Sequence, residues 1–112
     1  MRSYFKSLSK TQAVWEVKLN MPDGQRVIFC PEDMYIIDAA EKNLVEIPYA
    51  ARAGADAVSG GKLVSGAVDQ SAQSFLNVSQ ITNGYVLLDV AIPISNCEIE
   101  THKEQEIMDT LN

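Results

Sequence analysis

The stretch from 48 to 62 reads PYAARAGADAVSGGK, and it divides the chain into two regularly patterned parts. Its residues are mostly alanine and glycine, with neither the 3.6-residue period of an amphipathic helix nor the alternation of a strand. This composition predicts a loop from about 47 to 61. The loop contains no cysteine, and the two cysteines of the chain, Cys30 and Cys97, lie outside it.

The part before the loop reads as a hairpin followed by a helix. Residues 15–20 alternate apolar and polar side chains, as in a strand with one buried face, and residues 25–30 resume the pattern. Between them, residues 21–24 (MPDG) supply turn chemistry. Pro31 suits the first position of a helix, and apolar residues then recur at helical spacing to about Lys42.

The part after the loop predicts further strands and short helices. Residues 62–68 read as a short strand, residues 74–83 as irregular or short helical structure, and residues 85–91 as an apolar strand in the centre of a sheet. Residues 97–101 alternate again, which predicts a last strand. The run THKE at 101–104 has capping-box spacing, so a terminal helix is expected to begin near Lys103.

The 48–62 stretch closely resembles the cluster-binding loop of plant-type [2Fe–2S] ferredoxins. The resemblance continues through 68–76 (VDQSAQSFL), 84–91 (GYVLLDVA) and 99–104 (IETHKE), and it covers roughly residues 14 to 108. It implies an α+β fold of the β-grasp type, a mixed sheet crossed by one main helix with a short C-terminal helix. Residues 1–12 would then be a basic extension before a ferredoxin-like domain at 13–112.

The same resemblance assigns the cluster ligands. The family holds its two irons with four cysteine thiolates in a C-x4-C-x2-C run and one cysteine downstream. In this chain those places are Ala51, Asp56, Ser59 and Asp89. Iron in such a cluster prefers soft anionic sulfur, and a methyl side chain offers no donor atom. We therefore expect no cluster and no other cofactor.

Several roles are open for the residues at these positions. Asp56, Ser59 and Asp89 could converge to hold Mg²⁺ or Ca²⁺, or they could be solvated or hydrogen-bonded loop residues. Arg52 could neutralise Asp56 or Asp89. Metal–thiolate bonds also stabilise such a loop. Without them, residues 48–61 would be mobile, be fastened by replacement hydrogen bonds, or be clamped by a partner.

The net charge of −6 is unevenly distributed along the 112 residues. Residues 1–12 carry Arg2, Lys6 and Lys10 and no acid, so the remaining chain is strongly acidic. This balance argues against a nucleic-acid partner, which needs a basic face. The N-terminal extension could be a mobile tail, or an amphipathic helix that docks on a partner or a membrane surface.

The remaining chemistry-bearing residues predict no catalytic site. Cys30 and Cys97 fit buried apolar positions in a protein of a reducing compartment, and His102 fits a surface position. There is no nucleophile with a recognisable base and no zinc spacing. No apolar run approaches the roughly 18 residues of a membrane span, and the first residues do not predict a secretory signal.

The leading hypothesis is a ferredoxin-like protein without a cluster. It would be no enzyme and no electron carrier, and would act by protein–protein binding as a scaffold, assembly or regulatory subunit. Candidate partner-binding residues are Arg52, Phe75, Glu104 and Glu106. The family's association with photosynthesis implies a thylakoid photosynthetic complex or a ferredoxin-dependent enzyme as partner, and a location in the cytoplasm or plastid stroma, including the thylakoid surface. The alternative is an electron-transfer ferredoxin whose ligands were replaced by engineering.

Overall fold

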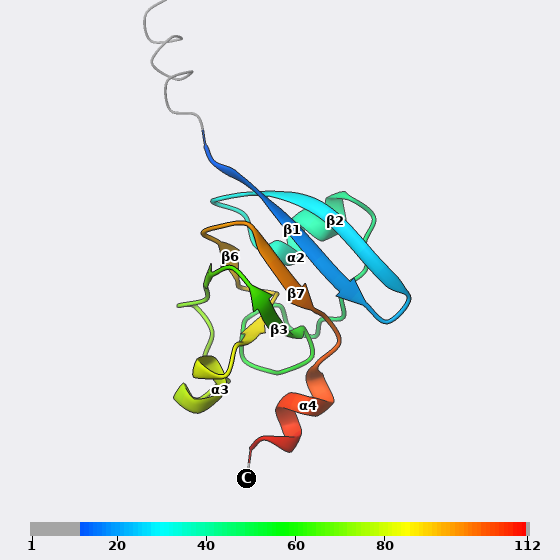
Figure 1. The fold of residues 1–112 in the computed structure, drawn as a ribbon. Coiled ribbons are helices and arrows are strands. Elements are labelled where there is room, and N and C mark those ends of the chain that lie inside the picture. Colours follow the sequence, from blue (N-terminus) through cyan, green and yellow to red (C-terminus); the bar gives the residue numbers. More distant parts are fainter. Residues whose placement is uncertain (1–11, 112) are drawn as a thin grey trace, which may run out of the picture.

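A computed structural model describes residues 12–111, which form a five-stranded sheet, a two-stranded sheet and short helices (Figure 1). The elements follow the chain in the order β1 (Val14–Met21), β2 (Gly24–Pro31), α2 (Ile36–Lys42), β3 (Gly60–Ser65), β4 (Val68–Asp69), α3 (Val78–Thr82), β5 (Tyr85–Leu87), β6 (Ile92–Pro93), β7 (Cys97–Glu100) and α4 (Glu104–Asp109). The large sheet has the order β2-β1-β7-β3-β5, and β4 pairs with β6. This mixed sheet with a few helices confirms the expected α+β, β-grasp fold.

The first hairpin forms as expected, with β1 antiparallel to β2 and Val17 opposite Ile28. Gly24 closes the turn with φ of 132°, a conformation that residues with a Cβ rarely adopt. Strand β7 then lies parallel to β1 and antiparallel to β3, so the last strand is the central one. The alternation predicted for residues 97–101 is confirmed, because Cys97 and Ile99 are buried while Glu98 and Glu100 are partly exposed.

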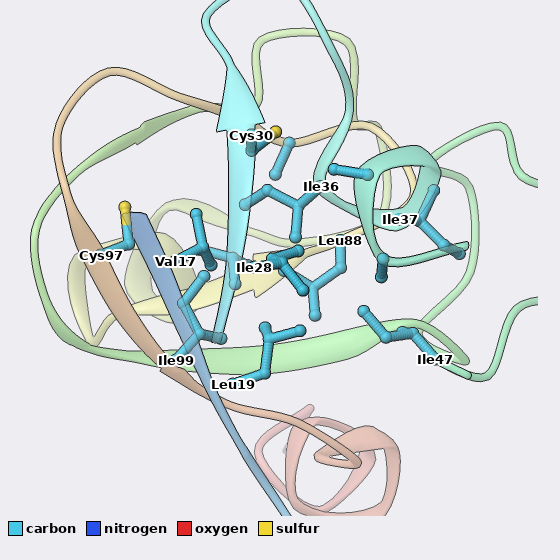
Figure 2. Close-up of a cluster of buried hydrophobic side chains, with 14 residues drawn as sticks. Val17, Leu19, Ile28, Cys30, Ile36, Ile37, Ile47, Leu88, Cys97 and Ile99 are labelled. Carbon is cyan, nitrogen blue, oxygen red and sulfur yellow. The ribbon is translucent and has the colours of Figure 1, made fainter. Parts of the chain in front are cut away.

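The main core lies between α2 and the five-stranded sheet (Figure 2). Val17 and Leu19 of β1, Ile28 of β2 and Ile99 of β7 meet the buried face of α2 there. A second cluster of buried residues joins the loop, the segment around β5 and the terminal helix, and consists of Ala57, Leu76, Tyr85, Leu87, Val90 and Ile107. The loop after α2 therefore packs against this second core through Ala57.

The helix starts later than the sequence suggested. Pro31 ends β2 opposite Val14 instead of opening a helix, and α2 begins at Ile36. Proline fixes φ and lacks an N–H, properties that suit a strand end on a sheet edge as well as a first helical turn. The hydrogen bond from Glu32 N to Ala13 O extends the strand pairing and decides between the two.

Two strand predictions were wrong in extent or place. The apolar run 85–91 contains only a three-residue strand, β5, which lies at the edge of the sheet. Its other apolar residues are buried because they pack in the two cores beyond the strand. The expected strand 62–68 is divided at Gly66, whose φ is 90°, into β3 and β4.

The terminal helix is confirmed but its cap is different. Lys103 is the N-cap of α4 and no side chain caps it, so the capping box expected at 101–104 does not form. The chain has a capping box at α3 instead, where Asn77 and Gln80 bond each other's backbone N–H. No helix within residues 12–111 has the length and hydrophobicity to cross a membrane. The predictions made for the N-terminal extension fall on residues that lie outside the described part, apart from residue 12.

Candidate functional site

The loop between α2 and β3 is fastened to Asp89, which follows β5. Asp89 is 2% exposed, and its Oδ2 accepts a hydrogen bond from Gly54 N at 3.0 Å. In return, Asp89 N donates to Ser59 Oγ at 3.2 Å, and Leu88 N donates to Ser59 O at 3.3 Å. Ser59 is as buried as Asp89, so two of the four positions of interest form one buried hydrogen-bonded contact.

The other two positions do not join this contact. Asp56 Oδ1 accepts a hydrogen bond from Val58 N at 3.0 Å, which forms a local turn. Ala51 lies on the surface with a methyl side chain. The sequence resemblance thus identifies four residues of which the structure pairs two, Ser59 and Asp89.

These residues do not fit an iron–sulfur cluster. Four thiolates are needed, and the side chains here offer one hydroxyl, two carboxyls and no donor at the fourth place. One oxygen of each side chain already accepts a backbone N–H group: Asp56 Oδ1 that of Val58, Asp89 Oδ2 that of Gly54 and Ser59 Oγ that of Asp89. Within residues 12–111 no group of three or more His, Cys, Asp or Glu could hold a metal ion. Of Asp56, Ser59 and Asp89, the structure brings the last two together, and a role of the three in binding Mg²⁺ or Ca²⁺ stays a prediction.

One buried oxygen of this site stays without a partner. Asp89 Oδ1 makes no hydrogen bond to any atom of residues 12–111. A buried polar atom without a partner costs stability. The bond through Oδ2 therefore stabilises the loop position less than a fully satisfied carboxyl would.

Gly54 allows the loop to approach its neighbours closely. It has φ of 69°, and a Cβ built on it would lie 2.6 Å from Val90 Cγ2 and 3.0 Å from Gln73 Cα. Its carbonyl oxygen also accepts a hydrogen bond from Ser74 N at 2.7 Å. Together with the buried Ala57, these contacts show replacement hydrogen bonds and packing where the sequence left mobility or a partner clamp as alternatives.

Arg52 does not neutralise Asp56 or Asp89, so that expectation was wrong. Its guanidinium forms ion pairs with Asp38 and with Glu41, the latter at 3.3 Å, and lies 4.6 Å above the ring centre of Tyr49. The hydrogen bond that the guanidinium donates to Glu41 raises the pKa of Arg52. Arg52 also has φ of 57°, a backbone conformation that is uncommon outside glycine.

The remaining candidate residues lie around α4. Glu106 accepts hydrogen bonds from Tyr85 Oη and from Lys103 Nζ, and the bond from Tyr85 lowers the pKa of Glu106. The same hydrogen bond, together with desolvation, raises the pKa of Tyr85 to about 12. Glu104 is exposed in the first turn of α4, and Phe75 is half-buried against the second core. Arg52 contacts α2 instead, and the role of these four residues in partner binding stays a prediction.

Both cysteines belong to the main core and are free thiols. Burial raises the pKa of the Cys30 thiol to about 12, with smaller contributions from nearby acidic groups. The Sγ atoms of Cys30 and Cys97 form hydrogen bonds with backbone carbonyl oxygens. These observations confirm the interpretation of both residues as apolar core positions. His102 is exposed, as expected.

Two residues of this region were missed by sequence reasoning. Asp38 and Glu41 bind Arg52, and the only signal for them was their position as acids on the helix that precedes the loop. Ion pairs between residues more than ten apart depend on the fold, so the sequence pattern could not select them.

Several known proteins that are similar to this chain are named ferredoxins. It is 41% identical over 100 residues to "Ferredoxin-6, chloroplastic" of Zea mays, which is 88% of this chain and 64% of the maize protein. It is 40% identical over 94 residues to "Ferredoxin, heterocyst" of a Nostoc species, 82% of this chain and 95% of that protein. The crystal structure of pectocin M2 matches with a TM-score of 0.79 and 41% identity over 85% of this chain and 35% of pectocin M2.

No protein-family model matches the chain. The similarity to the Nostoc protein nevertheless extends over nearly its whole length. The chain therefore belongs to the family of plant-type [2Fe–2S] ferredoxins. It spans somewhat less than two thirds of the maize relative and about a third of pectocin M2.

Proposed function

We propose that this chain is a ferredoxin homologue that holds no cluster, carries no electrons and acts by binding protein partners. The observation that carries the proposal is the contact of Asp89 with the loop. The buried carboxyl of Asp89 accepts a hydrogen bond from Gly54 N, and Ser59 Oγ accepts one from Asp89 N. Hydrogen bonds thereby link the loop to the segment after β5, where the resemblance puts cysteine ligands.

The alternative of an engineered electron carrier is less well supported by these contacts. Alanine, aspartate and serine stand at the four places instead of one inert residue. Two of the oxygens serve a buried hydrogen-bonded contact, and Gly54 packs against Val90 so closely that a methyl group would clash. A packed loop of this kind is consistent with a sequence that is stable without metal.

The partner proposed is a protein of a photosynthetic complex or a ferredoxin-dependent enzyme, in a plastid or a cyanobacterial cytoplasm. Support comes from the names of the relatives, which include chloroplastic and heterocyst ferredoxins. A protein that serves as a resident scaffold, assembly or regulatory subunit needs a surface for its partner but no redox centre. The acidic charge of the chain favours a partner with a basic surface.

Electrochemistry together with the visible spectrum tests this proposal. The purified protein is expected to be colourless and folded, and to give no reversible redox wave. The Nostoc heterocyst ferredoxin, prepared in the same way, is the matched control. A reversible one-electron wave accompanied by visible absorption would return the chain to the electron carriers.

A further inference from the structure

Leu44 has an unusual backbone conformation at the end of α2. Its φ is 59°, in the left-handed region that glycine normally occupies. Leu44 N donates to Glu41 O at 3.0 Å and Val45 N donates to Ala40 O at 2.9 Å. This pair of bonds is the Schellman helix end, in which glycine is the usual residue at the position of Leu44. These backbone bonds, together with the bond that Asn43 Nδ2 donates to Ala39 O at 2.7 Å, form the helix end without the Leu44 side chain, so it does not require a leucine.

The side chain of Leu44 is barely buried by folding. It is 92% exposed, the highest exposure among the large apolar residues of the described part. An isolated apolar residue on a surface is normal. An apolar residue that is exposed and also strained is different, because neither its conformation nor its burial stabilises the chain.

Leu44 lines two hollows of the surface. The first has a volume of about 460 Å³ and is lined by Ile37, Glu41, Leu44, Val45, Glu46, Ile47 and Tyr49. The second is lined by residues of the β1–β2 turn and by His102, and shares Leu44, Val45 and Glu46 with the first. Ile37 and Ile47 lie at the same end of the main core (Figure 2), so the floor of the first hollow is an extension of that core.

The charge at the first hollow is acidic. Glu41 and Glu46 are the charged residues that line it, and both are exposed. Arg52 neutralises Glu41 at 3.3 Å, whereas Glu46 has no ion pair within residues 12–111. A cation brought next to Glu46 would therefore find an uncompensated carboxylate, and an anionic membrane surface would be repelled.

We propose that Leu44 and the first hollow form the docking site for a protein partner that presents a large apolar side chain flanked by lysine or arginine. The inference rests on the proposed function and names its surface. The apolar side chain packs on Ile37, Val45 and Ile47, Leu44 covers it, and the basic residue pairs with Glu46. The strained conformation of Leu44 is then maintained for binding and not for folding.

Peptide selection tests this site without knowledge of the partner. Random twelve-residue peptides displayed on phage are selected on the immobilised full chain, and enriched peptides are measured against variants. Leu44→Gly and Leu44→Ala are each expected to weaken binding at least about tenfold, which corresponds to the loss of one anchor side chain. Glu46→Gln should weaken it less and reduce its salt dependence. Val78→Ala is the matched control, because Val78 is 80% exposed on α3, outside the residues that line either hollow.

The stability of the same variants separates binding from folding. Leu44→Gly should unfold at the same temperature as the wild type or above it, although its binding is lost. Equal binding by the wild type and Leu44→Gly, enrichment of acidic peptides, or no enrichment would overturn the proposal. So would self-association that Leu44→Gly abolishes, or a synthetic peptide of residues 1–11 that fills the site. None of these results would show that the chain contains an iron–sulfur cluster. The proposed function is therefore tested separately from this inference.

Discussion

The side chain of Asp89 accepts a hydrogen bond from the backbone N–H of Gly54 at 3.0 Å, across 35 positions of sequence. This bond attaches the middle of the loop to the segment after β5. Both residues are buried, so water cannot replace either partner. The loop position therefore depends on a carboxyl oxygen where the resemblance assigns a metal–thiolate bond.

Removal of the Asp89 side chain should destabilise the protein. In Asp89→Ala the buried Gly54 N–H loses its acceptor, which typically costs about 1–3 kcal/mol. Asp89→Asn should lose less, because its amide oxygen can still accept the bond. The free energy of unfolding in urea measures both variants. Asp56→Ala is the control and should lose less than about 1 kcal/mol, since Asp56 is half-exposed and bonds only Val58 N. Equal stability of Asp89→Ala and wild type would show that the bond does not hold the loop.

Gly54→Ala should destabilise the chain through contact with Val90. The new methyl group would lie 2.6 Å from Val90 Cγ2 in a backbone conformation with φ of 69°. A loss of about 1–3 kcal/mol is expected from the clash, with more from the strained φ. Val90→Ala removes the clashing methyl groups. The double variant should therefore lose less free energy of unfolding than the two single variants lose in sum. Strict additivity in a double-mutant cycle would mean that Gly54 and Val90 are not packed together.

The pH dependence of stability should report the hydrogen bond between Tyr85 and Glu106. Tyr85 has a folded pKa of about 12, above its ordinary value of 10.0. A raised folded pKa contributes stability below the ordinary value and loses it as pH rises through the folded value. The free energy of unfolding should thus fall between pH 10 and 12, more steeply for the wild type than for Tyr85→Phe. Cys30, whose pKa is also about 12, contributes the same slope to both proteins. Parallel curves for the two proteins would contradict the assignment.

Leu44→Gly should leave the protein as stable as the wild type or make it more stable. Glycine relieves a left-handed conformation that costs an ordinary residue about 1–2 kcal/mol, and its own extra unfolded-state entropy offsets about 0.4–1 kcal/mol of this gain. A net increase of about 0.5–1 kcal/mol in the free energy of unfolding is expected. Thermal and urea denaturation check it, with Val78→Ala as the exposed apolar control. A clear loss of stability would show that the Leu44 side chain packs in the folded chain.

The sequence predicts the hairpin, the last strand and the loop because their patterns are local. Alternation in residues 15–30 and 97–101 reflects one buried face, and the structure has the same faces. The prediction of a central strand at 85–91 was wrong because burial in two cores gives the same apolar pattern as a central strand. The helix start predicted at Pro31 was wrong because proline suits both a first helical turn and the end of an edge strand. Local patterns cannot distinguish such cases, which tertiary contacts decide.

The candidate site could be predicted only in part. The resemblance identified Ser59 and Asp89, but their mutual hydrogen bond and the role of Gly54 follow from the folded loop. Arg52 was given the wrong partners because Asp38 and Glu41 reach it from α2. The conformation of Leu44 carries a faint signal in the sequence, since a helix end at Asn43 is followed by leucine where glycine is usual.

Iron and acid-labile sulfide in protein isolated from its native cells, without reconstitution, test the central claim most directly. The variant with cysteine at positions 51, 56, 59 and 89 is the positive control, and it should take up both elements if the scaffold keeps the family geometry. The triple variant that leaves Ala51 in place should take up far less. We predict that the native protein contains neither iron nor sulfide in stoichiometric amount. Two irons and two sulfides per chain would contradict the account.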